Sequence, residues 1–196
     1  MWLVAGLGNP GPEYEHTPHN LGFLSVDRVA ARHAIRVTRK EANSLVGLGD
    51  VAGTPAVLVK PQTYMNVSGP AVKALLDKYE LTPANLLLVY DELALPWAQM
   101  RIRPRGSSAG HNGVRSVIRS VGTEEFARLR LGIHPGHPLN DTAKFVLEPM
   151  RKSLGKELDE MLDRAADAIE SILAEGVEKS MAKFNRRAPG STEEET

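Results

Sequence analysis

Three short apolar runs, each bounded by turn residues, give the clearest strand signals along the chain. They cover residues 2–7, 56–60 and 86–90. Because these runs contain almost no polar alternation, they predict interior strands of a sheet. Two further segments, 44–51 and 127–133, alternate apolar with polar positions and predict additional strands.

Apolar residues spaced three or four apart predict helices between and after these strands. One helix follows Ser68, which we expect to be its N-cap. A second begins at or just after residues 110–113, where the backbone N–H groups of a helix N-terminus would point outward. A long amphipathic helix covers 154–173 and ends near Gly176, and a weaker helical pattern covers 20–33.

Strands interleaved with helices predict an α/β fold. We expect a single three-layer globule in which a twisted, mixed and largely parallel sheet is flanked by helices. The chain contains no internal repeat and no clear linker, so we expect one domain over residues 1–187. A polar, acidic stretch over 188–196 predicts a disordered tail.

The composition is that of an ordinary globular protein, with 196 residues, of which 42% are apolar and 24% charged. No apolar run approaches the roughly 20 residues of a membrane span. The apolar N-terminus has neither the basic start nor the length of a signal peptide. We therefore expect a cytoplasmic protein without a membrane partner. The absence of cysteine excludes thiol nucleophiles, disulfides and Cys-ligated metals.

Acidic and basic residues balance at 24 each, but the basic ones concentrate between positions 100 and 133. That stretch holds only two acidic residues against these arginines: Arg101, Arg103, Arg105, Arg115, Arg119, Arg128 and Arg130. The stretch is either a solvated face balanced by acids elsewhere or a binding site for a polyanion.

Two motifs suggest alternative enzyme classes. Residues 6–11 read G-x-G-x-x-G after a strand, which is typical of an NAD(P)-binding oxidoreductase, although Pro10 and Pro12 interrupt the loop and Asp27 falls in a helical stretch. Residues 106–110 read G-x-S-x-G, which would make Ser108 the nucleophile of an esterase, although no apolar strand precedes it.

The histidines allow a weak metal hypothesis. His16 with His19, and His134 with His137, have spacings that could share an ion, with Asp91 and Glu92 as oxygen ligands. Neither pair forms the H-E-x-x-H arrangement of zinc hydrolases, so we expect no metal and no other cofactor.

Single polar residues follow several of the apolar elements. This set consists of Asn9, His19, Asn20, Asn66, Asp91, His111 and Asn112. An imidazole, a carboxylate and several carboxamides are sufficient for ester cleavage by water, provided that they converge in space.

These residues also carry a family resemblance. Residues 6–11 with His19 and Asn20, then 64–69, 91–96 and 110–113, resemble in their order the signature of bacterial-type peptidyl-tRNA hydrolases. The resemblance extends to about Arg187. The chain departs from the usual pattern at Pro18, at Tyr90 and in the loop 107–109, and none of these positions is a catalytic side chain.

The resemblance implies hydrolysis of the ester between the peptide and the tRNA in peptidyl-tRNA, which recycles the tRNA. His19 would be the general base that activates water, with Asp91 holding its tautomer and Asn9 positioning the ester. The remaining residues expected to bind substrate are Tyr14, Tyr64, Met65, Asn66, His111 and Asn112.

The resemblance further implies that Arg103 and Arg130 clamp the 5′-phosphate at the acceptor end of the tRNA. We expect a monomer without an obligate protein partner. A nicotinamide oxidoreductase, a Ser108 esterase and a non-enzymatic RNA-binding module are the alternatives.

Overall fold

The apolar runs form the centre of a sheet in a computed structural model, which describes residues 1–185. β1 (Trp2–Gly6) lies between β4 (Thr54–Pro61) and β5 (Leu86–Pro96) and is parallel to both. β7 (Ala127–His134) is parallel to β5 on its other side. The strands predicted at these positions are confirmed, and β5 continues six residues past the apolar run that predicted it.

Antiparallel strands complete the sheet at both edges. β2 (Arg39–Glu41) and β3 (Ser44–Val51) extend it beyond β4, and β6 (Met100–Arg103) extends it beyond β7. The strand order is β2-β3-β4-β1-β5-β7-β6. The expected mixed sheet with a largely parallel core is therefore confirmed.

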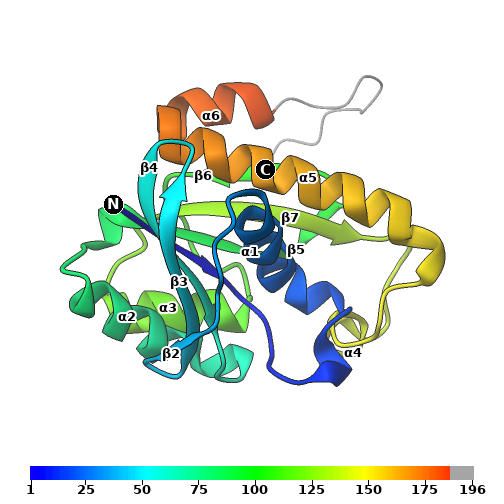
Figure 1. Ribbon diagram of the computed structural model, residues 1–196. Coiled ribbons are helices and arrows are strands. Elements are labelled where there is room, and N and C mark those ends of the chain that lie inside the picture. Colours follow the sequence, from blue (N-terminus) through cyan, green and yellow to red (C-terminus); the bar gives the residue numbers. More distant parts are fainter. Residues whose placement is uncertain (186–196) are drawn as a thin grey trace.

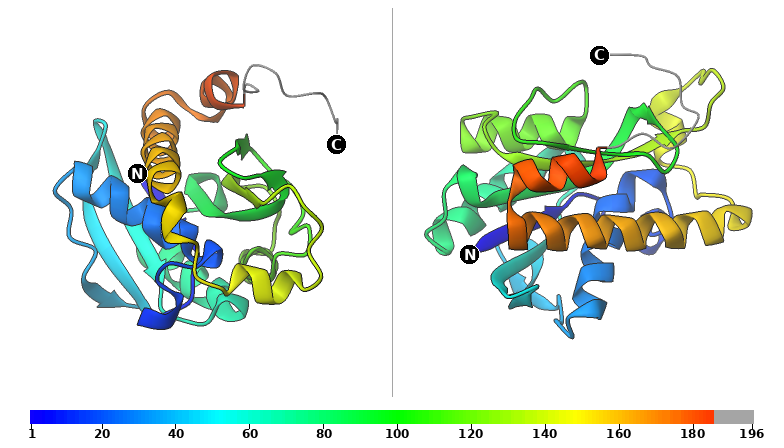
Figure 2. Two further views of the ribbon diagram at one scale, coloured as in Figure 1. Left: turned by 90° about the vertical axis from the view of Figure 1, so that its right-hand side faces the viewer. Right: turned by 90° about the horizontal axis from the view of Figure 1, so that it is seen from above.

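Helices cover both faces of the sheet (Figure 1, Figure 2). α1 (Leu21–Arg32) and α5 (Gly155–Glu175) pack on one face, and α2 (Ser68–Lys78) and α3 (Asn112–Val121) pack on the other. Each pair of helices closes its own apolar core, because strands buried on both sides need cover on both sides. This arrangement confirms the three-layer α/β fold.

Two shorter helices were not predicted as separate elements. α4 (Thr142–Val146) follows β7, and α6 (Val177–Phe184) follows α5 after a turn at Gly176, whose φ of 92° suits glycine. Just beyond α6, the side chain of Asn185 accepts from the backbone N–H of Ile102 at 2.7 Å and donates to its carbonyl at 3.0 Å. A single side chain thus occupies part of the open edge of β6.

The predicted N-cap of α2 is wrong. A 3₁₀ turn over Met65–Val67 leads directly into the helix, so Val67 is the N-cap and Ser68 already has helical backbone angles. The Ser68 hydroxyl donates instead to the carbonyl of Met65 at 2.8 Å. The acidic tail predicted at 188–196 and the last two residues of the predicted domain lie outside the described residues.

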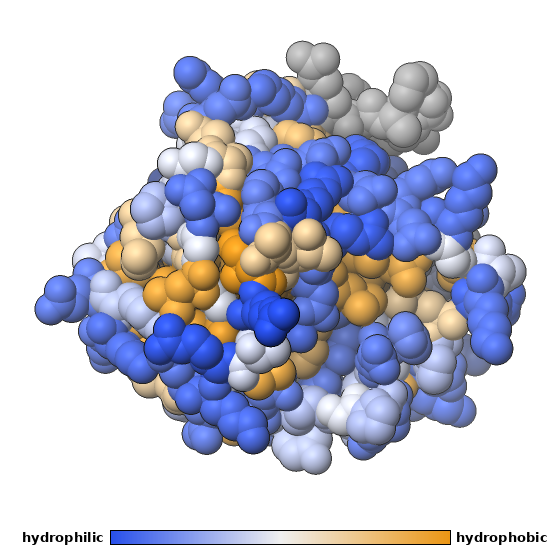
Figure 3. Space-filling model, in the orientation of Figure 1, coloured by the Kyte–Doolittle hydropathy of each residue, from blue (hydrophilic) through white to orange (hydrophobic). Residues whose placement is uncertain are grey.

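The outer surface of α5 is strongly polar (Figure 3). Arg28 of α1 pairs with Asp159 and Asp163 of α5, and Arg32 pairs with Asp163 and Asp167. These exposed pairs bridge the two helices along the rim of their apolar contact. Over residues 1–185, no helix is long and apolar enough to cross a lipid bilayer.

Close packing of α2 on α3 requires glycine at position 69. The Gly69 N–H donates to the Ser116 hydroxyl at 2.8 Å, and a Cβ on Gly69 would overlap the carbonyl oxygen of Ser116. We expect Gly69→Ala to lower the free energy of unfolding by about 1–3 kcal/mol, because the two helices would have to separate. Urea unfolding followed by circular dichroism measures the loss.

Gly155→Ala is the matched control, because nothing lies within 4 Å of a Cβ at this helical position. Alanine there should leave stability unchanged or raise it by up to about 1 kcal/mol. Equal stability of Gly69→Ala and the wild type would show that the contact between α2 and α3 tolerates a side chain at position 69.

Candidate active site

A cavity of about 570 Å³ opens at the carboxyl ends of the central strands, where α/β sheets usually bind ligands. The loop after β1 brings Asn9 to it, β5 brings Asp91, and the N-terminus of α3 brings His111 and Asn112. The polar residues that line the cavity are Asn9, His19, Tyr64, Asn66, Asp91, Glu92, His111, Asn112 and Thr142. Most of the predicted site residues therefore converge in space.

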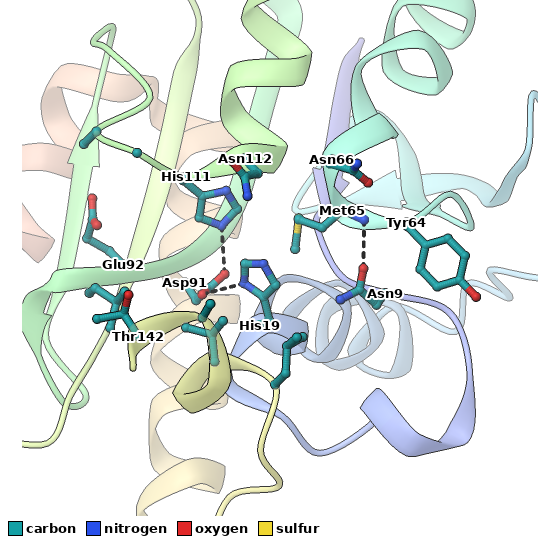
Figure 4. A pocket seen from close by; sticks show the side chains of 16 residues that line it. Asn9, His19, Tyr64, Met65, Asn66, Asp91, Glu92, His111, Asn112 and Thr142 are labelled. Atoms are coloured by element: carbon teal, nitrogen blue, oxygen red, sulfur yellow. Dashed lines mark hydrogen bonds and ion pairs between the residues drawn. The ribbon is translucent and has the colours of Figure 1, made fainter. Parts of the chain in front are cut away.

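His19 and Asp91 form the central pair of this cavity (Figure 4). Nδ1 of His19 lies 2.8 Å from Oδ2 of Asp91, whose side chain is only 2% exposed. Burial alone would raise the pKa of Asp91, but attraction to His111 and His19 and their hydrogen bonds hold that pKa well below its usual range. Asp91 is thus ionised and can only accept. Nδ1 of His19 must donate, which leaves the lone pair on Nε2.

A second imidazole contacts Asp91 from its other oxygen. Nε2 of His111 lies 2.9 Å from Oδ1 of Asp91. The other ring nitrogen of His111, Nδ1, caps α3 by accepting from the backbone N–H groups of Gly113 and Val114 at 3.1 and 3.3 Å. The carboxylate therefore joins His19, in the loop before α1, to the first turn of α3.

Asn9 is held rigidly at the floor of the cavity. Its Oδ1 accepts from the backbone N–H of Met65 at 2.8 Å. The side chain of Asn20 bonds both backbone groups of Asn9, accepting from its N–H at 2.8 Å and donating to its carbonyl at 3.0 Å. The site prediction did not assign this role to Asn20, and its position next to His19 is the only signal in the sequence.

Three residues stand at the mouth of the cavity. The side chain of Tyr64 is 60% exposed, and Asn66 and Asn112 are exposed as well. Figure 4 shows Asn66 and Asn112 on different segments, on either side of the opening. A smaller cavity of about 380 Å³ between α2 and α3 adjoins the first at these two asparagines.

The structure does not bring Tyr14 into the cavity. Tyr14 ends a 3₁₀ turn over Pro12–Tyr14, and its carbonyl accepts from the backbone N–H and the hydroxyl of Thr17 at 3.1 and 2.8 Å. The residue shapes the loop that carries His19 and is absent from the cavity lining.

The two arginines predicted to bind phosphate lie on β6 and β7, outside the cavity lining. The strand register pairs Arg101 with Arg130 and Arg103 with Arg128. Because directly paired residues share a face, all four guanidinium groups project from the same side of the sheet. Arg128 is 1% exposed and bonds backbone carbonyls, among them that of Glu124 at 2.9 Å.

Glu92 connects this arginine face to the cavity. Nε of Arg130 donates to Oε1 of Glu92 at 2.9 Å, and Nη2 of Arg130 contacts the same oxygen. Glu92 also lines the cavity, next to Asp91 in the sequence. From the sequence, Glu92 was expected only within the family motif and as a possible oxygen ligand of a metal. The cavity wall formed by α4 was not predicted, because that helix is too short to show a period.

The hydrogen bonds of the two histidines around Asp91 bear on whether this cluster could bind a metal ion. Ligand atoms of His19, Asp91 and His111 lie within 4.8 Å of one another, a spacing that a metal ion could bridge. However, both imidazole nitrogens that face Asp91 donate protons to it, so an ion would have to displace two hydrogen bonds. The arrangement suits proton transfer.

The structure lacks the local geometry that an NAD(P)-binding oxidoreductase or a Ser108 esterase would need. Only a three-residue 3₁₀ turn, Pro12–Tyr14, opens at the G-x-G-x-x-G loop, where a dinucleotide site needs an α-helix. A Cβ on Gly6 would overlap the carbonyl oxygen of Gly22, so this glycine serves the packing of α1 on β1. Ser108 lies in the loop between β6 and α3 and not on a strand-to-helix elbow, and it does not line the cavity.

Comparison with known proteins agrees with this geometry. The family model described as peptidyl-tRNA hydrolase matches residues 3–193. The chain is 56% identical over 195 residues to the peptidyl-tRNA hydrolase of Solibacter usitatus, with 100% of both chains covered. It is 46% identical to that of Koribacter versatilis, over 95% of this chain and 94% of the relative.

Solved structures extend the likeness to the fold. A crystal structure of peptidyl-tRNA hydrolase from Acinetobacter baumannii superposes with a TM-score of 0.87 at 32% identity and covers 97% of each chain. Family model, full-length relatives and fold therefore agree. The chain belongs to the peptidyl-tRNA hydrolase family and is an enzyme with that activity.

Proposed function

We propose that the enzyme cleaves the ester between the peptide and the terminal ribose of tRNA with His19 as general base. The observation that carries this proposal is the 2.8 Å bond from Nδ1 of His19 to the ionised Asp91, which leaves Nε2 as an acceptor at the cavity. A neutral imidazole is the side chain best matched to proton removal near pH 7.

The reaction proceeds in two proton transfers. Nε2 of His19 takes a proton from water as the oxygen attacks the ester carbonyl, and Asp91 stabilises the imidazolium that forms. When the ester bond breaks, the imidazolium returns the proton to the ribose oxygen. The products are the free peptide carboxylate, the free tRNA hydroxyl and a released proton, and the tRNA is available for recharging.

Carboxamides position the substrate in this mechanism. Asn9, fixed by Met65 and Asn20, holds the ester close to His19. Asn66 and Asn112 at the mouth bind the peptide backbone and the carbonyl oxygen, because an amide can donate and accept without changing its charge. Tyr64 and Met65 provide apolar contact for the peptide. Tyr14 supports the His19 loop from outside the cavity lining.

A blocked α-amino group is part of the recognition. In N-acylated substrates the amide next to the ester matches Asn66 and Asn112, whereas a free aminoacyl ester presents an ammonium group that neutral amides pair with poorly.

Arg103 and Arg130 bind the 5′-phosphate of the acceptor end in this proposal. They project from the same side of the sheet, and guanidinium forks suit the paired oxygens of a terminal phosphate. Glu92 already bonds one edge of Arg130 and orients it. We propose that the enzyme acts on peptidyl-tRNA as a cytoplasmic monomer.

Removal of the base tests the first step. We expect His19→Ala to fold normally and to lower kcat on N-acetyl-aminoacyl-tRNA by about 10²- to 10⁴-fold, the usual contribution of a positioned base. His16→Ala is the matched control, because His16 is exposed and contributes only its backbone carbonyl to the contact with Met150.

The same assay on unblocked aminoacyl-tRNA should show much slower cleavage by the wild type. A folded His19→Ala enzyme with the wild-type rate would remove His19 from the mechanism.

The pH profile tests the role of Asp91. Because the pKa of Asp91 lies well below its usual range, the acid limb of the wild-type rate should reflect His19 alone. In Asp91→Asn the imidazolium loses its anionic partner, so the limb should move to lower pH while the maximal rate falls. Asp27→Asn, which removes a carboxylate paired with Lys60 on the surface, should change neither. An unchanged profile in Asp91→Asn would contradict the pairing.

The proposed phosphate site can be tested by comparing two substrates, one with the 5′-phosphate and one without it. Arg103→Ala with Arg130→Ala should raise KM for full-length peptidyl-tRNA and flatten its salt dependence, because fewer counterions are released on binding. A minimal peptidyl-nucleotide ester without the 5′ end should lose much less activity, limited to the effect of leaving Glu92 without its partner Arg130. Arg36→Ala with Arg39→Ala removes the same charge at the opposite end of the sheet and should leave both substrates unaffected. Equal loss on both substrates would make the two arginines structural.

A further inference from the structure

The imidazole of His111 has no polar atom left for a substrate. Nδ1 accepts from two backbone N–H groups of α3, and Nε2 bonds Asp91 at 2.9 Å. The side chain is only 8% exposed, although it borders the cavity. Both of its nitrogens are therefore committed within the protein.

This bonding decides which ring nitrogen of neutral His111 carries the proton. A proton on Nδ1 would break both bonds to Gly113 and Val114 and would face their N–H groups at the positive end of a helix. Nε2 consequently carries the only ring proton and donates it to Asp91. The tautomer follows from the bonds at both nitrogens.

Packing holds the ring in this orientation. The ring of Tyr90 makes a T-shaped contact with it at 5.0 Å between centroids, and the centroid of the His19 ring lies 5.1 Å away. Gly113 lies behind it, and a Cβ there would sit 3.2 Å from Cε1 of His111 and would overlap the sulfur of Met65. The ring is therefore enclosed on several sides.

We propose that His111 is a positioning residue, which anchors the carboxylate of Asp91 to the first turn of α3. Of the two imidazoles bonded to Asp91, His19 then supplies the ring nitrogen that accepts a proton from water. Oδ1 of Asp91 stays fixed by His111, so Oδ2 remains directed at His19. The N–H of His111 also disperses part of the carboxylate charge, which limits how strongly Asp91 favours the imidazolium form of His19. The inference rests on His19 being the base.

Few other charged or titratable groups face the two imidazoles. Asp91 lies between them, Glu92 with its partner Arg130 lies beside them on β5 and β7, Tyr90 lies against His111, and Tyr64 stands at the mouth. Glu92 is neutralised by Arg130, so Asp91 is the charge that governs the pH dependence of His19.

Two substitutions separate the two bonds of His111. In His111→Asn the amide oxygen lies where Nδ1 was and can cap α3, but the side chain is too short to reach Asp91. In His111→Gln the amide nitrogen lies near the place of Nε2 and can donate to Asp91, but the cap is lost. His111→Asn therefore keeps the cap of α3 and loses the bond to Asp91, and His111→Gln does the reverse.

We expect His111→Asn to melt below the wild type, because the buried carboxylate loses a donor. It should also lose about 10- to 100-fold in kcat, with KM within about twofold, because the carboxylate is no longer aligned. The acid limb of its rate profile should move to higher pH, opposite to Asp91→Asn, because Asp91 loses a donor. His111→Gln should recover most of kcat and melt about 2–4 °C lower through loss of the cap.

A raised KM in both variants with an unmoved pH limb would overturn the proposal, because that result is expected of a residue that binds substrate. Nitrogen NMR of ¹⁵N-histidine-labelled enzyme gives a readout independent of activity. We expect neutral His111 to show the Nε2–H tautomer and neutral His19 the Nδ1–H tautomer, and a neutral His111 with its proton on Nδ1 would also overturn the proposal. Loss of the His19 role in the His19→Ala assay, with the His111 tautomer still fixed, would contradict the proposed function and leave the tautomer assignment standing.

Discussion

A buried carboxylate that accepts from two imidazoles sets most of the demands on this structure. The side chain of Asp91 is 2% exposed. A carboxylate buried this deeply is stable only if its oxygens accept hydrogen bonds from neighbouring groups. Its two partners come from segments 92 residues apart in sequence, the loop before α1 and the N-terminus of α3. The sheet keeps both segments in place, because β1 and β7 flank the strand that carries Asp91.

Hydrogen bonds between the loops around the site connect the position of His19 to the positions of Asn9 and Met65. Asn20 follows His19 directly and bonds both backbone groups of Asn9, and Asn9 in turn holds the backbone of Met65. The chain of bonds runs from the start of α1 through the loop after β1 to the turn before α2. A shift of the His19 loop would thus move the floor of the cavity as well, and local flexibility at this site is costly.

Much of the fold could be predicted because its signals are local. Continuous apolar runs marked the central strands, and apolar spacing marked the helices that cover them. The failures have local causes too. Ser68 looked like a cap because a serine before a proline and an apolar stripe usually is one, whereas a 3₁₀ turn had already started the helix. α4 has five residues, which is too few to show a period.

The composition of the site could be predicted better than its contacts. The polar residues after the strands, together with the family resemblance, located His19, Asp91, Asn66 and Asn112 at one cavity. The bonds of His111 to Asp91 and of Glu92 to Arg130 depend on which side chains meet across strands and helix ends, and spacing in sequence carries no information on that.

The hydrogen bonds between Asn185 and the edge of β6 can form only late in the synthesis of the chain. Residue 185 leaves the ribosome long after residue 102, so β6 has an open edge while α5 and α6 are still being made. Until then, the strand that carries Arg103 presents unpaired backbone groups to any neighbouring chain. During synthesis the outer edge of β6 therefore stays open to mispairing until α6 is complete, and a chain that stops before α6 keeps that edge open permanently.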